Sequence, residues 1–258
     1  MDTRIPAACI ALTLLLPSPG RAEDACRAQS GATTRPLVEL YTSEGCDSCP
    51  PADRWLSRTF ARNDASAIAL AFHVDYWDRL GWKDRFASAA FTERQHRAAE
   101  ANRAGFVYTP QVLLQGHDFA WRDQQAGSAL GAAAQAPARA SLSVTAERRG
   151  AVVDVHATAT IADAALRRGA TVGLAYVDGN LVSDVKAGEN RGVRLTHDHV
   201  VRALFEGGAP DAHGALVSHT TFAVPAEPGR APAIVAFVQR PRTGDVLQAV
   251  ELPLSDCP

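Results

Sequence analysis

The sequence predicts an α/β domain followed by an all-β, sandwich-like domain. In the first half, short apolar runs alternate with stretches of helix-forming residues, which is typical of α/β domains. In the second half, about eight strand-length runs are separated by turn residues, which indicates a β-sandwich. The alanine-rich stretch AAAQAPARA separates the two patterns, so we place the domains at residues 23–135 and 140–258.

The first half contains three predicted strands and three predicted helices. The first helix has Ala52, Leu56 and Phe60 at every fourth position, which places them on one face. The run AIALAFHVDYW is apolar without alternation, as in a strand buried on both faces. The predicted strands cover residues 36–43, 67–77 and 110–116, and the predicted helices cover residues 51–62, 88–105 and 124–136.

The second half is predicted to consist of strands joined by short turns. Asp178-Gly179 lies between two β-like runs and is a hairpin signal. His197 and His199 are two residues apart on a predicted strand and therefore share a face. A metal site would need a third ligand, so we interpret them as a solvent-facing pair.

The first 22 residues have the pattern of a secretory signal peptide. Arg4 is followed by the apolar run AACIALTLLL and by small residues that end at Ala22. The apolar run is too short to span a bilayer. We therefore expect an exported protein, periplasmic or secreted, with no transmembrane segment in the mature chain.

Four cysteines remain once the signal peptide is removed, and they allow three connectivities. Cys46 and Cys49 are close enough in sequence to pair locally, which leaves Cys26 and Cys257 at opposite ends of the mature chain. An oxidising compartment favours a second disulfide between them. Two free terminal thiols are the alternative.

The pair Cys46 and Cys49 lies between a predicted strand and a predicted helix. The N-terminus of a helix stabilises a thiolate through its free N–H groups and its dipole. We expect Cys46 to be exposed as the attacking thiolate and Cys49 to be shielded as the resolving thiol. A structural zinc site would need a second Cys/His pair, and the sequence shows none.

Polar residues near this pair are candidates for a supporting role. His73 and Asp75 would point to the same side of an extended chain, where they could modulate Cys46, bind a metal or bind substrate. Alternatively, they belong to a structural loop in which aspartates cap turns and tryptophans pack. Glu44 is either a proton acceptor near Cys49 or an exposed loop residue.

Three segments, VELYTSEGCDSCPPAD, FHVDYWDRLGWKDRF and VYTPQVLLQG, carry a family resemblance. In this order they resemble the exported thioredoxin-like family named domain of unknown function 1223 (DUF1223), over residues 36–116. The resemblance implies a thioredoxin-like fold for the first domain, with Pro110 as a cis-proline opposite the cysteines. Thr109 would offer backbone groups to an extended substrate. The chain departs from ordinary thioredoxins at Gly45, where tryptophan is usual.

We therefore expect a thiol–disulfide oxidoreductase or isomerase that acts on exported proteins with thiols or disulfides and needs no cofactor. The net charge of −2 argues against nucleic acid as a partner. One alternative is a copper- or other metal-handling module with Cys46, Cys49 and His73 as ligands. Another is a non-catalytic binding protein in which Cys46–Cys49 is a permanent structural disulfide.

Overall fold

The computed structural model describes residues 26–61 and 66–257, so the predicted signal peptide and its cleavage site lie outside the described residues. The α/β half comprises β2 (Leu37–Thr42), α1 (Pro50–Thr59), β3 (Ile68–His73), the 3-10 helix η1 (Asp78–Leu80), α2 (Ala89–Ala101), β4 (Gln111–Leu114), β5 (His117–Asp118) and α3 (Ala126–Gln135). None of the described helices has the length and apolar character needed to cross a bilayer.

The other elements are mostly strands. They are β1 (Cys26–Gln29), β6 (Ser141–Arg149), β7 (Val152–Thr160), α4 (Ala164–Arg167), β8 (Thr171–Gly179), β9 (Leu181–Asp184), β10 (Arg194–His197), β11 (Val200–Gly207), β12 (Ala215–Ala223), β13 (Arg230–Gln239), β14 (Val246–Pro253) and the 3-10 helix η2 (Leu254–Asp256).

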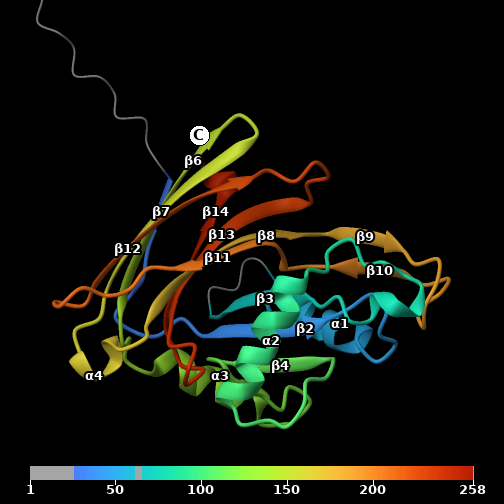
Figure 1. Cartoon of the computed structure of the whole chain (residues 1–258), viewed down its shortest axis with the longest axis horizontal. Coiled ribbons are helices and arrows are strands. Elements are labelled where there is room, and N and C mark those ends of the chain that lie inside the picture. The colour runs from blue at the N-terminus through green and yellow to red at the C-terminus, as the bar shows by residue number, and fades with distance from the viewer. Residues whose placement is uncertain (1–25, 62–65, 258) are drawn as a thin grey trace, which may run out of the picture.

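An eight-stranded mixed sheet runs through both halves of the chain in the order β14-β13-β8-β11-β3-β2-β4-β5. β2 and β3 are parallel, and β11 joins β3 in parallel, so the sheet crosses the predicted boundary between the domains. A separate antiparallel sheet has the order β1-β6-β7-β12, and β9 and β10 form a two-stranded ribbon. This ribbon projects beyond the end of β8, toward the side of α1 (Figure 1). The fold is therefore a mixed α/β fold with a second, antiparallel sheet.

Both faces of β2 and β3 are covered, which explains why every residue of these two strands is buried. On one face, residues of these strands pack with Phe91 of α2. On the other face, residues that include Val38 and Leu40 pack with Ala52 and Leu56 of α1. The cysteine turn between β2 and α1 therefore begins and ends on buried elements.

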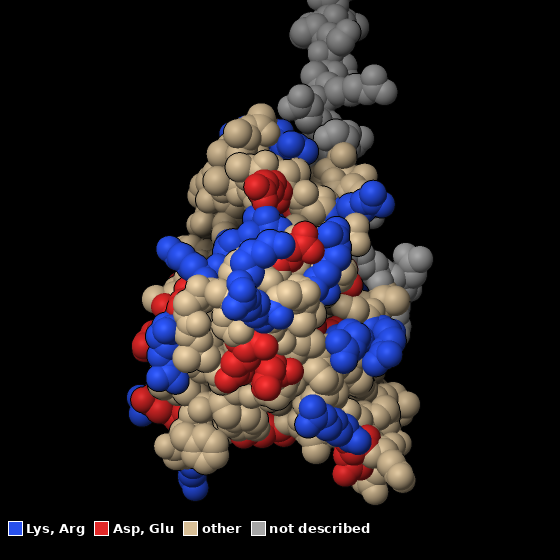
Figure 2. Space-filling view, turned by 90° about the vertical axis from the view of Figure 1, so that its right-hand side faces the viewer, with Lys and Arg blue, Asp and Glu red and all other residues tan. Residues whose placement is uncertain are grey.

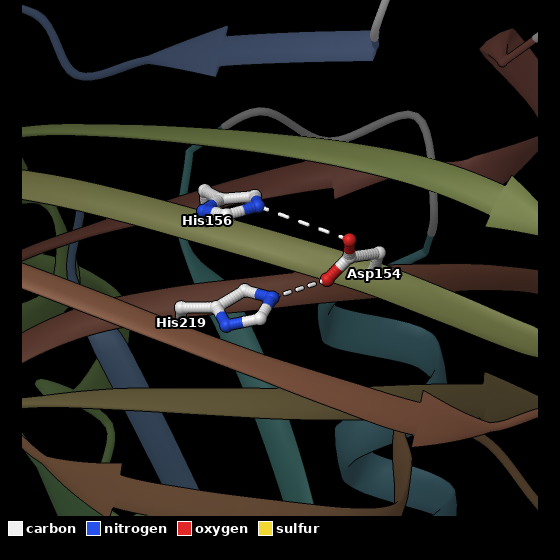
Figure 3. A group of neighbouring side chains, drawn as sticks. All are labelled: Asp154, His156 and His219. Atoms are coloured by element: carbon white, nitrogen blue, oxygen red, sulfur yellow. Dashed lines mark hydrogen bonds and ion pairs between the residues drawn. The ribbon is translucent and has the colours of Figure 1, made fainter.

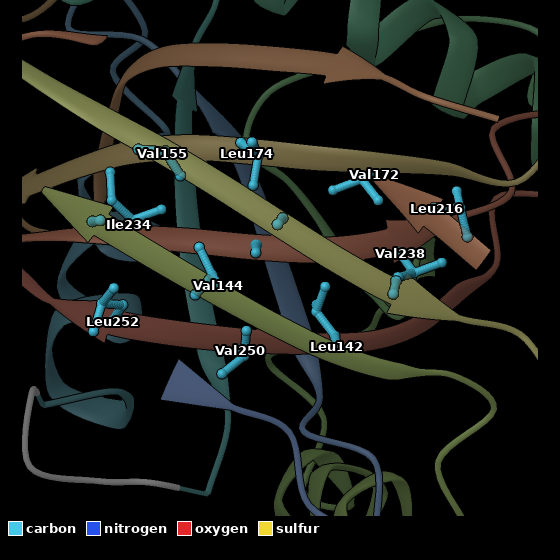
Figure 4. Packing of buried hydrophobic residues seen from close by; sticks show 14 of the residues in the cluster. Leu142, Val144, Val155, Val172, Leu174, Leu216, Ile234, Val238, Val250 and Leu252 are labelled. Carbon is cyan, nitrogen blue, oxygen red and sulfur yellow. The ribbon is translucent and has the colours of Figure 1, made fainter. Parts of the chain in front are cut away.

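The antiparallel sheet buries only one of its faces. Buried and more exposed residues alternate along β6, β7 and β12. The inward residues pack against β8, β13 and β14, as Figure 4 shows for Leu142, Val155 and Ile234. The outward residues of the same strands face solvent, so this face is free to carry polar groups.

Two features differ from the sequence-based expectations. The hairpin predicted at Asp178-Gly179 is wrong, because β8 pairs with β11 and β13 while β9 pairs with β10. The carboxylate of Asp178 is buried and accepts hydrogen bonds from the backbone N–H groups of Gly179 and Gly229. It therefore satisfies buried backbone groups and does not form a hairpin turn. In addition, β1 pairs with β6, which joins residues 26–29 to the second sheet.

The predicted disulfide between Cys26, in β1, and Cys257 is confirmed.

A buried arginine links α2 to strands from both halves. Arg94 donates to both carboxylate oxygens of Glu39 on β2, at 3.0 and 2.9 Å. It also donates to Glu206 of β11 at 2.5 Å and to Gln239 of β13 at 3.0 Å. The nearby carboxylates hold the pKa of Arg94 above its usual value, although burial alone would lower it. The guanidinium is therefore charged and fully engaged at the junction of the two halves.

We predict that Arg94→Met lowers the free energy of unfolding by about 3–5 kcal/mol, because it leaves Glu39 buried without its charged partner. Arg97→Met is the matched control, since Arg97 lies one turn along α2, pairs with the same Glu206 and has a side chain that is 40% exposed. The control should cost only about 0–1 kcal/mol. Equal losses in urea-induced unfolding would contradict a special role for Arg94.

Candidate functional site

The cysteine pair closes the turn between β2 and α1. Cys46 and Cys49 form a disulfide with their Cα atoms 5.5 Å apart. Cys49 is the N-cap residue of α1, and Pro50 and Pro51 occupy the first turn, where the missing N–H groups cost no helical hydrogen bond. The backbone N–H of Asp53 donates to the carbonyl of Cys49 at 3.2 Å and begins the helix. The disulfide therefore lies at a helix N-terminus.

Both cysteines are fully buried, with 0% of each exposed. The expectation that Cys46 is exposed is therefore wrong. The segment between β9 and β10, residues 185–193, covers the turn, and we call it the cover loop. Within it, Asn190 donates from Nδ2 to the carbonyls of Glu44 and Cys46 at 2.9 and 2.8 Å. Glu189 accepts from the backbone N–H of Asp47 at 3.1 Å.

Thr109 and Pro110 lie beside the start of the cysteine turn. The pairing of Tyr41 with Gln111 puts Pro110 next to the last residue of β2, and the Thr109–Pro110 peptide bond is cis. Thr109 Oγ1 accepts from Trp77 Nε1 at 2.8 Å. A Cβ atom at Gly45 would lie 3.0 Å from Trp77 Cβ. Trp77 thus occupies the space that a larger residue at position 45 would need.

Several ionisable side chains are buried beside this turn. His73 at the end of β3 pairs through Nδ1 with Asp84 Oδ2 at 2.7 Å, and both side chains are 0% exposed. Asp84 Oδ2 also accepts from the backbone N–H of Glu44 at 2.9 Å. Glu44 in turn accepts at Oε2 from Trp82 Nε1 at 2.7 Å. Glu44 is therefore a buried member of the site, and the exposed-loop alternative is wrong.

His197 completes this group from the second half of the chain. Its Nε2 lies 3.2 Å from Glu44 Oε1, at ion-pair distance but without hydrogen-bond geometry. The centres of the His73 and His197 rings are 4.9 Å apart. His197 is 2% exposed and His199 is 7% exposed, so the expected solvent-facing pair is wrong. The cause is that β10 packs against α1 and turns His197 inward.

Asp53 is a further buried acidic residue, four residues after Cys49 on α1 and 8% exposed. Burial raises the pKa of its carboxyl. The nearby His197 and His73 act in the opposite direction but offset this increase only in part. A cleft of about 160 Å³ between α1 and β10 is lined by Asp53, Arg194 and His197, among others. Asp53 and His197 therefore border this cleft. We call Glu44, Asp53, His73, Asp84 and His197 the buried cluster.

The charge states within the buried cluster follow from the partners. Burial alone would lower the pKa of His73, but the adjacent Asp84 carboxylate raises it above its usual value. Burial would raise the pKa of Asp84, but His73 and the backbone N–H groups of Glu44 and Phe86 lower it. The contacts with His197 and Trp82 likewise lower the pKa of Glu44 against the effect of burial. Both shifts favour the ion-paired form of His73 and Asp84.

Asp75 does not join the buried cluster. Its Oδ1 accepts from Thr92 Oγ1 at 2.6 Å, which ties the segment after β3 to α2. The alternation that would have aligned it with His73 ends because β3 ends at His73. Conversely, no pattern in the sequence indicated that His197 or Asn190 lie at the cysteine turn. Only Asp53 carried a local signal, as the residue one helical turn after Cys49.

We predict that the His73–Asp84 pair makes stability depend on pH. Because the folded pKa of His73 is raised, its contribution is complete below the unfolded value of 6.5 and is lost as the pH rises through the folded value. Because the pKa of Asp84 is lowered, its contribution is complete above 3.8 and is lost as the pH falls through the folded value. Urea unfolding of His73→Gln should lack the alkaline loss of stability.

The control for this measurement is His213→Gln, which changes an exposed histidine in the segment before β12. It should keep the pH profile of the unchanged protein. An alkaline loss of the same size in His73→Gln would show that the pair does not set the profile.

Comparisons with known proteins place the chain in a family. A solved structure of protein AGR_C_4864 from Agrobacterium tumefaciens has 26% sequence identity and a TM-score of 0.60, with 86% of this chain and 96% of that chain covered. HBP35 of Porphyromonas gingivalis has 14% identity and a TM-score of 0.62, with 88% of this chain and 77% of that chain covered, and shows the fold alone. The curated proteins contain no match. The model of the family described as "Protein of unknown function (DUF1223)" matches residues 37–239 and so spans the cysteine turn, the buried cluster and the cover loop. The chain belongs to the DUF1223 family.

Proposed function

We propose that this protein is an exported thiol–disulfide oxidoreductase whose Cys46–Cys49 pair exchanges disulfides with other exported proteins. The observation that carries the proposal is the position of this disulfide at the N-terminus of α1, bordered by the buried cluster. Helix N-termini stabilise thiolates. Buried ionisable groups are costly, and they gather at sites where proton transfer is needed.

The connections within the first half support a thioredoxin-like arrangement. β2, α1 and β3 form a parallel β-α-β unit, and β4 and β5 then continue the sheet antiparallel beyond β2, followed by α3. Thr109 and Pro110 border the cysteine turn, where their backbone groups would hold an extended substrate. The two disulfides support export to an oxidising compartment.

The exchange runs through a mixed disulfide. A thiolate of the partner attacks Cys46 Sγ, the Cys46–Cys49 bond breaks, and Cys49 leaves as a thiolate. A second cysteine thiolate of the partner then attacks the partner sulfur that is bonded to Cys46 Sγ. This forms the partner's disulfide and releases Cys46 as a thiolate. The partner is oxidised to a disulfide and the cysteine pair is reduced, and the reverse sequence reduces a partner disulfide. We assign proton exchange with Cys49 to Asp53, whose pKa burial raises and which lies one turn along the same helix.

We predict that Cys49→Ser accumulates mixed disulfides with partner proteins, because the thiol that resolves them is gone. Cys46→Ser should neither trap partners nor support exchange. Both variants are expressed in the exporting host, quenched with acid and separated on non-reducing gels. Trapping by Cys46→Ser alone would reverse the two roles, and trapping by neither variant would contradict the proposed exchange.

The burial of both cysteines means that exchange requires the cover loop to move. Asn190 is 5% exposed and holds the loop to the turn through its two hydrogen bonds to backbone carbonyls. The loop belongs to the ribbon that projects from the sheet, so it can separate from the turn without breaking the sheet. On the side of the molecule toward which the ribbon projects, basic and acidic side chains are interspersed (Figure 2). We infer that partner binding is accompanied by displacement of this loop.

We predict that Asn190→Ala speeds the reduction of Cys46–Cys49 by dithiothreitol. Each lost hydrogen bond contributes about 1 kcal/mol, so losing both should raise the open population by about tenfold or more. The control is Arg191→Ala, an exposed neighbour in the same loop, which should leave the rate unchanged. Equal rates in both variants and the unchanged protein would show that this contact does not limit access.

The burial of both cysteines also favours a second candidate function, a non-catalytic binding protein with a permanent disulfide. Disulfides of that kind have reduction potentials below about −300 mV, whereas exchange sites lie higher. A potential measured by equilibration with glutathione distinguishes the two functions. The copper-handling alternative stays a prediction, with His73 bound to Asp84 in the structure.

A further inference from the structure

We propose that the outer face of the antiparallel sheet carries a binding site for a divalent transition-metal ion, formed by Asp154, His156 and His219. This site goes beyond thiol–disulfide exchange and uses none of the residues at the cysteine turn. It rests on three side chains from two neighbouring strands, which the fold brings together on one solvent-facing surface (Figure 3).

The strand register fixes this arrangement. His156 of β7 lies directly opposite His219 of β12 in the antiparallel ladder. Asp154 precedes His156 by two residues on the same strand, so its side chain emerges on the same face. The two imidazole rings stack with their centres 4.2 Å apart and their planes at 19°. The backbone therefore presents the three groups side by side.

The donor atoms converge on one point. His219 Nε2 lies 2.5 Å from Asp154 Oδ1, and His156 Nε2 lies 3.9 Å from Asp154 Oδ2. One ligand atom of each residue lies within 4.8 Å of the others. Ligand atoms about 2.0–2.1 Å from a tetrahedral zinc ion are about 3.4 Å apart, so small side-chain rotations would suffice. Figure 3 shows the two Nε2 atoms turned toward the carboxylate.

The donor set and its exposure define the ligand. Two imidazole nitrogens and one carboxylate oxygen suit Zn²⁺ and Cu²⁺ better than Ca²⁺ or Mg²⁺, which prefer oxygen. The side chain of Asp154 is 16% exposed, whereas those of His156 and His219 are 57% and 53% exposed. The carboxylate thus forms the base of the site, and the solvent side leaves a coordination position for water or an external ligand. Such a site exchanges its metal with solution.

Arg149 is a basic side chain close to the site, but it does not cancel the attraction of Asp154 for a cation. Arg149 Nη1 lies 3.6 Å from Asp154 Oδ2. However, Arg149 donates to both carboxylate oxygens of Glu147 at 2.9 and 2.7 Å, and this pair is neutral. The negative charge of Asp154 therefore remains available to a metal ion.

Isothermal titration calorimetry with Zn²⁺ tests the proposal on the untagged mature protein with both disulfides intact, so that thiols cannot bind the ion. We expect one saturable site per chain. His156→Asn and His219→Asn should each weaken binding by at least about tenfold, since changes even around a metal ligand cost about 10- to 100-fold. Because both histidines are exposed, the variants should fold normally, which their thermal unfolding midpoints check.

His213→Asn is the matched control, because it removes an exposed histidine near β12 that is outside the site, and it should bind Zn²⁺ as the unchanged protein does. Electron paramagnetic resonance with Cu²⁺ gives a second readout. We expect hyperfine coupling from two imidazole nitrogens, reduced to one in each histidine variant. Absence of saturable Zn²⁺ binding, or equal affinity in the His156 and His219 variants and the unchanged protein, would overturn the proposal.

Discussion

The buried ion pair between Arg94 and Glu39 is the interaction on which the joint between the two halves depends. Arg94 enters from α2, and its guanidinium meets carboxylates or an amide on three strands of one sheet. It also lies over the rings of Phe72 and Phe237, at 5.3 and 5.2 Å from their centres. A buried charge is tolerated only where its partners are fixed. The helix and the strands must therefore keep one relative position.

The fixed position of the two halves relative to each other places the β9–β10 ribbon over the cysteine turn. Because β11 continues the sheet beside β3, the preceding ribbon of β9 and β10 is carried across the end of β2 and the start of α1. His197 and Asn190 reach the turn from this ribbon, and they meet Glu44 and Cys46. The second half of the chain is therefore part of the site and not an appended module.

The buried cluster and the proposed disulfide exchange require opposite states of the cysteine turn. The cluster beside the turn includes the buried pair of His73 and Asp84, whose charges are tolerated there only when paired, and this favours a closed interior. The exchange that we propose would require a partner to reach Cys46 Sγ, which favours an open turn. The cover loop meets the turn through two hydrogen bonds from Asn190 and one accepted by Glu189. Each such bond contributes only about 1 kcal/mol, so these contacts can close the turn and still release it. The outer face of the second sheet carries no such conflict, since its side chains already face solvent.

Local patterns in the amino-acid sequence specify the elements of the α/β half. Apolar runs identified β2 and β3, four-residue periodicity identified α1, and a stretch rich in helix-forming residues identified α2. These signals depend on residues a few positions apart. The spacing of Cys46 and Cys49 likewise indicated a local disulfide at a helix start, and the leftover pair indicated a link between Cys26 and Cys257.

The way in which these elements combine follows from contacts between residues far apart in the chain. The burial of Cys46 depends on Asn190, which is 144 residues away, and the placement of His197 beside Glu44 depends on the same ribbon. The site of Asp154 and His156 needs His219 from another strand, and nothing near either segment specifies that pairing. Such contacts are set by strand order and register, which follow from packing the whole core. Local sequence periodicity does not contain this information.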